Sequence, residues 1–219
     1  MDHLVILGDL FEFFFGFKKV SSPQPPFAFP DYLPILEALQ HLYRQGVCIK
    51  YFEGNHDFFL HSFFSQQLGM EVEVYAEGNE ERLGGKRTFI AHGDLSGPRQ
   101  WRYRIFRRIL KNRWTYSVIQ LAGPNLSRRI AKGLSDVSYQ KYHTHTNSSP
   151  PPAFKDFAHQ KFLEGFEIVI LGHSHFPEEV EESIHGKRSL YFNVGDWVIH
   201  RSFLRFTPPD RFALDHFMD

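Results

Sequence analysis

The chain has 219 residues, a length typical of one large domain or of a domain with an inserted segment. Its 25 basic and 25 acidic residues balance to a formal net charge of zero, which argues against a protein whose whole surface attracts polyanions. The single cysteine, Cys48, excludes an internal disulfide, and no apolar run approaches the roughly 20 residues of a membrane span. Because no basic leader precedes Leu4, we expect a cytoplasmic protein, either free or peripheral to the inner membrane.

Four short apolar runs predict buried strands, and each is followed at once by polar residues of the kinds that bind metals. The runs and the residues after them are Leu4–Leu7 with Gly8-Asp9, Val47–Phe52 with Gly54-Asn55-His56-Asp57, Arg87–Ala91 with His92-Gly93-Asp94, and Ile168–Leu171 with Gly172-His173-Ser174-His175. In open α/β sheets, ligands bind at the carboxyl ends of the strands. We therefore expect the four clusters to lie on one rim of the fold.

The remaining segments complete a single domain over residues 1–219. A loop is predicted at residues 21–30, a helix at residues 31–46, and antiparallel strands at residues 190–194, 198–206 and 212–217. Residues 96–165 form a helical insert, with helices expected at residues 98–121 and 126–134 and a proline-rich linker at residues 147–152. The pattern predicts an α/β fold, either a mixed sheet or a two-sheet sandwich, covered by helices.

The chemistry of the four clusters favours a hydrolytic metal centre. Carboxylate, amide and imidazole groups suit hard or borderline dications, and two such ions about 3.5–4 Å apart can act together on a phosphorus atom. Each cluster alone is equally typical of a turn. Their joint occurrence, each at the end of an apolar strand, makes metal binding the favoured interpretation. The candidate ligands are Asp9, Asn55, His92, His173 and His175.

This series of motifs resembles the calcineurin-like metallophosphoesterases, whose fold is a sandwich of mixed β-sheets flanked by helices. The resemblance implies two divalent metal ions, expected to be manganese, with iron, cobalt or zinc as alternatives. Asp9 would bridge the two ions, and His175 would bind the second one. Asn55, His92 and His173 would complete the first site. His56 would act as general acid or stabilise the phosphate, oriented by Asp57.

Within that superfamily the chain is most similar to the UDP-2,3-diacylglucosamine hydrolases and their sister group. The similarity rests on Phe11-Glu12 after Gly-Asp-Leu, the basic insert, and Gly195-Asp196-Trp197. It implies cleavage of UDP-2,3-diacylglucosamine to UMP and 2,3-diacylglucosamine 1-phosphate in lipid A biosynthesis. The substrate would be a lipid-linked nucleotide sugar, and no protein partner is inferred.

Two positions depart from that family. His56 stands where those hydrolases commonly have arginine. The Asp-x-His motif that opens the superfamily is absent before Gly8, so that one metal site keeps only Asp9 and His175. We expect the true start to lie upstream of Met1, and a truncated or degenerate, weakly active form is the alternative.

The insert is basic and aromatic. Ten Lys and Arg residues and no acidic residue stand between Arg99 and Lys132. A solvated helix face is the ordinary interpretation of such a run, but here acidic partners for ion pairs within the helix are missing. We expect a cap over the metal rim that holds substrate, with an anionic membrane surface as a further partner. The residues expected to bind substrate are Trp101, Arg102, Arg108 and Arg113.

Two other functions stay open at this point. One is a different calcineurin-like phosphoesterase, such as a nuclease or phosphatase, in which the insert would hold nucleic acid. The zero net charge makes nucleic acid the second choice, and none is expected as a partner. The other is a non-catalytic binding protein that keeps the fold and one metal ion.

Overall fold

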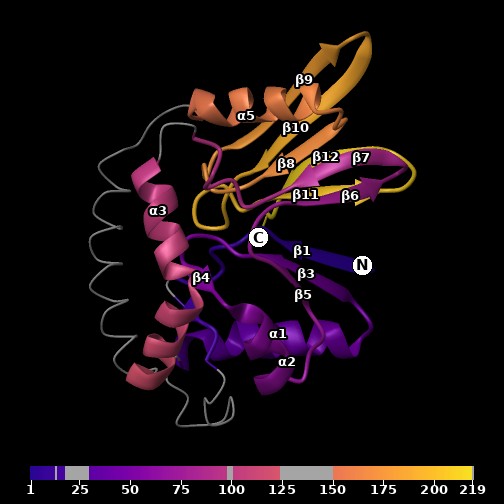
Figure 1. Ribbon diagram of the computed structural model, residues 1–219. Helices are drawn as coiled ribbons and strands as arrows, with labels where there is room; N and C mark the ends of the chain where they lie inside the picture. Colours follow the sequence, from indigo (N-terminus) through magenta and orange to yellow (C-terminus); the bar gives the residue numbers. More distant parts are fainter. Residues whose placement is uncertain (13, 18–29, 98–100, 124–149, 219) are drawn as a thin grey trace. The chain divides into compact units, whose positions relative to one another are not determined.

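A computed structural model describes residues 1–12, 14–17, 30–97, 101–123 and 150–218 (Figure 1). The chain divides into two compact units. The first comprises Met1–Ala76 and Trp101–Thr146, and the second comprises Glu77–Gln100 and Asn147–Asp219. The middle part of the expected insert therefore belongs to the first unit, together with the first two predicted metal motifs.

The first unit contains a parallel sheet with the strand order β1-β3-β5. In this sheet Ile6 pairs with Tyr51, so β1 and β3 end at the same edge. The elements of this unit other than the insert are β1 (His3–Ile6), β2 (Phe14–Phe15), η1 (Pro30–Tyr32), α1 (Leu33–Arg44), β3 (Cys48–Phe52), β4 (Asp57–Phe58), α2 (Leu60–Gln67) and β5 (Glu73–Tyr75). The short strands β2 and β4 pair in parallel beside that edge.

Phenylalanine fills the core of the first unit. Seven of the chain's 24 Phe residues are buried in one cluster with leucines from α1 and α2. Among them, Phe14 contacts Phe63 edge-on with ring centroids 4.9 Å apart, a preferred aromatic geometry. These seven phenylalanines therefore pack a core and do not line an apolar binding site.

The insert begins as the helix α3 (Trp101–Leu110), and helical backbone resumes over residues 113–123. The predicted helix thus has an interruption at residues 111–112. The reason is local, because the Asn112 side-chain oxygen accepts the Trp114 N–H at 2.8 Å and starts a new helix there. Leu110 and Ile119 pack against the phenylalanine core, whereas Ile105, Ile109 and Trp114 are exposed.

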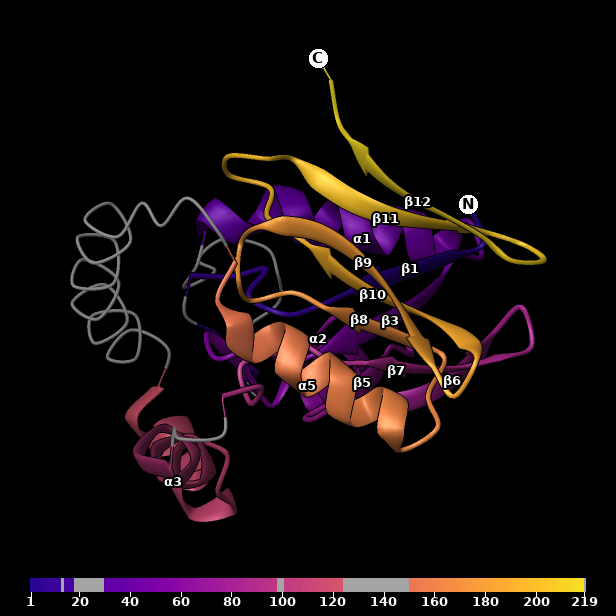
Figure 2. The same cartoon turned by 90° about the horizontal axis from the view of Figure 1, so that it is seen from above.

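The second unit holds a five-stranded mixed sheet with the order β6-β7-β8-β10-β9. Strands β7 and β8 are parallel neighbours, as are β8 and β10. The helix α5 lies along this sheet and buries Phe154, Ala158 and Phe162 against it (Figure 2). The elements are β6 (Asn79–Leu83), β7 (Lys86–Ile90), α5 (Pro152–Leu163), β8 (Ile168–Leu171), β9 (Pro177–Ile184) and β10 (Lys187–Val194).

A separate antiparallel hairpin, β11 (Ser202–Thr207) and β12 (Arg211–His216), follows in the same unit. The predicted strand at residues 198–206 is wrong in its first part, because Val198, Ile199 and His200 form a turn. The backbone N–H groups of all three donate to the Asp196 carboxylate oxygen Oδ1, at 2.7–3.0 Å. These hydrogen bonds occupy backbone N–H groups that a strand would use for pairing, a competition that is common for Asp side chains.

The predicted α/β class with a mixed sheet is confirmed, and so are the four strands that precede the metal motifs and the helix at residues 31–46. Strand β9 and helices α2 and α5 were not predicted. The predicted loop at residues 21–30, except for Pro30, and the helix at residues 126–134 lie outside the described residues, as does most of the predicted linker. Within the described ranges, every helix is too short or too polar to cross a membrane.

Candidate metal centre

In the first unit, the parallel pairing of β1 and β3 brings Asp9 and the Asn55-His56 loop to one sheet edge. The Asp9 carboxylate accepts the His56 backbone N–H at 2.9 Å. A Cβ atom on Gly54 would lie 2.1 Å from the Asp9 oxygen Oδ1, so only glycine permits this approach. The predicted ligands Asp9 and Asn55 therefore come from two loops that are packed against each other.

Asp57 holds these two loops together through hydrogen bonds to both. Its side chain is fully buried and accepts hydrogen bonds from the backbone N–H of Gly54 at 2.6 Å, from that of Leu10 at 3.2 Å, and from the Tyr51 hydroxyl. Burial, and then the neighbouring Asp57 charge, raise the pKa of Tyr51 well above its usual value. Tyr51 therefore stays a neutral donor, and sequence patterns gave no signal for its role.

Replacing Asp57 with alanine is expected to lower the free energy of unfolding by about 3 kcal/mol or more, because it leaves two buried donors and one partly buried donor without an acceptor, at about 1–3 kcal/mol for each buried one. Chemical denaturation measures the change. Asp215→Ala is the matched control, since Asp215 pairs with Arg205 on an exposed hairpin and such pairs contribute less than about 1 kcal/mol. Equal losses for the two variants would contradict this role for Asp57.

The His56 ring is held by a backbone carbonyl. Its Nδ1 atom lies 2.5 Å from the Glu12 oxygen, and since a carbonyl only accepts, Nδ1 carries the hydrogen. This contact fixes the ring orientation and leaves Nε2 as the nitrogen that could exchange a proton. Asp57 orders the loop beneath His56, while Glu12, from the first motif, orients the ring. The Glu12 backbone contact was not foreseen, because any residue type offers that carbonyl.

In the second unit, the ends of β7 and β8 bring two predicted ligands together. The Gly172 N–H donates to the His92 carbonyl at 2.9 Å, and His92 Nε2 lies 2.9 Å from His173 Nδ1. His92 is buried and His173 is partly buried. Two nitrogens that each bind one ion at about 2.1 Å are about 3 Å apart when they meet at a right angle. The observed pair therefore fits a shared divalent ion.

His175 follows in the same loop and faces Asp196. Its Nδ1 atom lies 3.8 Å from the Asp196 oxygen Oδ2, and that carboxylate also contacts the His200 ring at 3.3 Å. Burial raises the pKa of Asp196, but hydrogen bonds from the His200 and Ile199 backbone outweigh it, so the pKa lies below its usual value. A carboxylate beside an imidazole is the arrangement that commonly orients histidine ligands of metal ions. The Gly195-Asp196-Trp197 motif was noted in the sequence, but this role was not.

Three of the predicted ligands adopt left-handed backbone conformations. The φ angles are 52° at Asp9, 63° at His173 and 64° at His175. For residues other than glycine this conformation costs roughly 1–2 kcal/mol. Such strain persists where surrounding contacts enforce it and is concentrated at functional sites. Predicted ligands thus make up half of the described non-glycine residues with positive φ; the other three are Phe59, His185 and Arg201.

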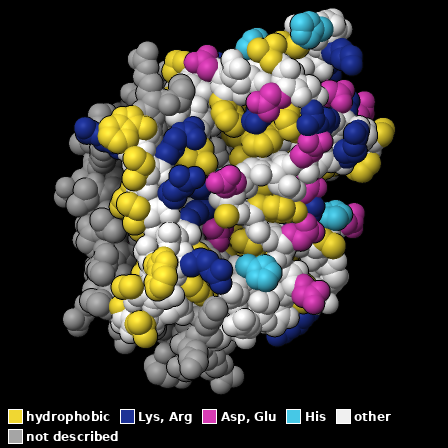
Figure 3. Space-filling model, viewed as in Figure 1, with side chains coloured by type: hydrophobic (Ala, Val, Ile, Leu, Met, Phe, Trp, Pro, Cys, Tyr) yellow, Lys and Arg dark blue, Asp and Glu magenta, His cyan; other side chains and the backbone are white. Residues whose placement is uncertain are grey.

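The predicted substrate residues lie on the insert. Trp101, Arg102, Arg108 and Arg113 are all exposed, and the Arg102 guanidinium lies 5.3 Å from the centre of the Trp101 ring. Along α3, basic and exposed hydrophobic side chains lie next to one another (Figure 3).

Convergence of the first unit's ligands, Asp9 and Asn55, with the second unit's histidines stays a prediction. The roles assigned to the metal, catalytic and substrate residues also stay predictions.

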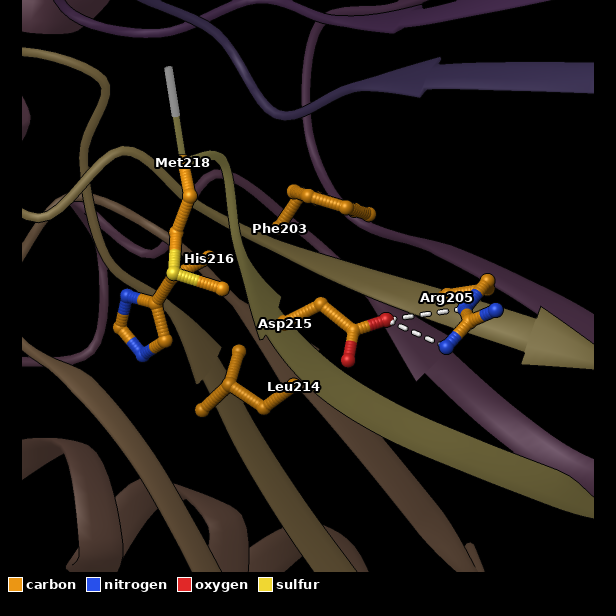
Figure 4. A pocket seen from close by; sticks show the side chains of 6 residues that line it. All are labelled: Phe203, Arg205, Leu214, Asp215, His216 and Met218. Carbon is orange, nitrogen blue, oxygen red and sulfur yellow. Dashed lines mark hydrogen bonds and ion pairs between the residues drawn. The ribbon is translucent and has the colours of Figure 1, made fainter.

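A shallow pocket elsewhere in the second unit takes no part in this site. It lies on the hairpin β11–β12, where Arg205 pairs with Asp215 at 2.8 Å (Figure 4). None of the predicted metal, catalytic or substrate residues lines it. Its lining residues are Phe203, Arg205, Leu214, Asp215, His216 and Met218.

Comparison with known proteins decides the family. The chain is 30% identical over 217 residues to the UDP-2,3-diacylglucosamine hydrolase of Aeromonas salmonicida, covering 96% of this chain and 79% of that one. The chain belongs to the UDP-2,3-diacylglucosamine hydrolase family. The Photobacterium profundum enzyme of the same name is 28% identical over 216 residues, covering 95% of this chain and 81% of that one.

Two further comparisons complete the findings. No protein-family model matches the chain. Among solved structures it is similar to an archaeal phosphodiesterase, with a TM-score of 0.39, 13% identity, and coverage of 84% of this chain and 78% of that one. Membership of the UDP-2,3-diacylglucosamine hydrolase family confirms the predicted hydrolytic enzyme of the metal-dependent phosphoesterase class.

Proposed function

We propose that this protein hydrolyses UDP-2,3-diacylglucosamine to UMP and 2,3-diacylglucosamine 1-phosphate. The observation that carries the proposal is the 30% identity, over nearly the whole chain, to an enzyme named for that substrate. In the reaction, water adds across the P–O–P bridge. One bond to the bridging oxygen breaks, and each product keeps one phosphorus atom.

The predicted ligands form a donor set suited to two divalent ions. Asp9, Asn55, His92 and His173 would hold the first ion, and Asp9 with His175 would contribute to the second. Manganese suits this mixture of carboxylate, amide and imidazole groups. When bound, the ions supply Lewis acidity at the phosphoryl oxygens.

His56 would donate a proton to the departing phosphate oxygen. The Glu12 carbonyl holds its Nδ1–H, so the proton transferred would be the one on Nε2. The same carbonyl would stabilise the ring in one orientation as it gains and loses that proton. Asp57 contributes by ordering the loop through Gly54 and Leu10.

The insert would bind the rest of the substrate. Arg102, Arg108 and Arg113 offer guanidinium groups for the diphosphate, and the exposed Trp101 offers apolar surface for an acyl chain. The same basic and aromatic surface suits an anionic membrane, at about 1 kcal/mol for each basic residue close to it. The enzyme would then work at the cytoplasmic surface of the inner membrane, where a lipid-linked substrate is found.

Shortening the acyl chains is expected to reduce kcat/KM steeply. Each buried methylene contributes about 0.8 kcal/mol, so removing two methylenes should cost up to about fifteenfold. Hydrolysis of a series of UDP-diacylglucosamines in the presence of manganese measures the trend. A single-stranded oligonucleotide in the same assay is the comparison, and preferential cleavage of it would replace this proposal with a nuclease.

A further inference from the structure

The insert is attached to the rest of the first unit through a largely buried ion pair. Lys111, directly after α3, places its ammonium 3.1 Å from Glu53 Oε2 and 3.0 Å from the Ala76 carbonyl. The Phe58 ring centre lies 5.6 Å from the same ammonium. The side chains of Lys111 and Glu53 are only 12% and 5% exposed. The positive charge of Lys111 is therefore stabilised by a carboxylate, a backbone carbonyl and the face of an aromatic ring.

Glu53 connects three elements of the first unit. It follows β3 directly, its backbone N–H donates to Tyr75 at the end of β5, and its Oε1 accepts the Leu60 N–H that begins α2. The next three residues are Gly54, Asn55 and His56, which carry a predicted ligand and the predicted acid. Lys111 thus binds a side chain that β5 and α2 already hold in place beside that loop.

Two neighbouring contacts strengthen this attachment. Arg107, buried on α3, donates to the same Ala76 carbonyl at 2.8 Å. Further along, Tyr116 and Gln120 donate to the Gly16 carbonyl at 2.9 and 3.1 Å. Gly16 follows β2 and in turn donates to the Phe58 carbonyl of β4, so these contacts join the insert to the β2–β4 pair that follows the two loops.

A buried ion pair contributes little net stability, because desolvation of both charges offsets their attraction. It penalises displacement strongly, since a separated partner remains buried and unpaired. A hydrophobic pair could hold α3 on the core but would tolerate sliding. The Glu53–Lys111 pair, with its defined hydrogen bonds, fixes the helix at one position.

We propose that Glu53 and Lys111 are positioning residues that form a latch between the insert and the Gly54–His56 loop. The latch holds α3 where its exposed Trp and Arg residues meet substrate. It adds binding energy for the amphiphilic substrate and none for a small one. This inference rests on the proposed function for its substrate and on the described contacts for its geometry.

Lys111→Met tests the latch because it removes the ammonium and keeps the apolar stem. We expect amide hydrogen exchange in residues 101–123 to accelerate about tenfold. We expect kcat/KM for UDP-diacylglucosamine to fall about tenfold, mainly through KM, and turnover of bis(p-nitrophenyl) phosphate to change by less than about twofold. Lys111→Arg, which can still donate to both acceptors, should restore exchange and KM to within about threefold of wild type.

Two further variants keep the test decisive. Glu53→Gln retains an acceptor for Leu60 but loses the charge, and it should accelerate exchange in the same residues even if Lys111→Met does not fold. Lys155→Met is the matched control, because the half-exposed Lys155 side chain makes a Lys–Glu pair of 2.7 Å with Glu178 on the second unit. That variant should leave exchange of residues 101–123 and both activities unchanged.

Unchanged exchange in Lys111→Met and Glu53→Gln would overturn the latch. Equal losses on the lipid and the small phosphodiester would also overturn it, because the pair would then support the metal loops rather than the insert. If wild-type enzyme cleaves the small diester but not UDP-diacylglucosamine, the proposed function fails, and the exchange measurement alone decides the latch.

Discussion

The His92→Ala variant is expected to lose its metal and nearly all its activity. His92 is buried, and its Nε2 lies 2.9 Å from His173 Nδ1, so the two rings would share one ion. Even the loss of an outer partner of a metal ligand typically costs 10–100-fold, so losing the ligand should lower kcat by more than about a hundredfold. Metal content by mass spectrometry and turnover of a small aryl phosphodiester measure both effects.

The control for this experiment is His159→Ala. His159 is a half-exposed histidine of the same unit that pairs with Glu182 at 2.8 Å. It should keep both metal and activity, which separates ligand loss from a general effect of removing a histidine. Retention of metal and full turnover by His92→Ala would refute the shared site.

A different outcome is expected for His56→Ala, which should lower turnover by about 10²–10⁴-fold while metal content stays near that of wild type. The reason is that His56 would move a proton at Nε2, with its Nδ1 already held by the Glu12 carbonyl. Single-turnover kinetics together with metal analysis distinguish the two roles. His61→Ala, on the exposed side of α2, is the control and should behave as wild type.

Loss of metal in His56→Ala would make His56 a ligand and would overturn the proposed role. Loss of activity on the lipid nucleotide with unchanged turnover of a small phosphodiester that also has a poor leaving group would count against it, because a proton donor assists every such leaving group. The aryl diester has a good leaving group, so its smaller loss of rate would agree with the proposed role.

The local sequence was sufficient to predict the strands that end in ligand-type residues. Apolar runs such as Ile168–Leu171 are buried as expected, and Gly54 and Gly172 mark the turns after them. These features depend on hydrophobic periodicity and on the short-range chemistry of turns, both of which are written within a few neighbouring residues. The basic, aromatic character of α3 was visible for the same reason.

The tertiary structure decided which of these residues meet. The pairing of β1 with β3 joins Asp9 to a loop 47 residues away, and His92 meets His173 across 81 residues. The latch joins Glu53 and Lys111 across 58 residues, and Glu12 holds His56 with a backbone carbonyl that carries no sequence signature. Strand order, left-handed backbone at the ligands and buried ion pairs arise from packing between distant segments, and no local pattern encodes them.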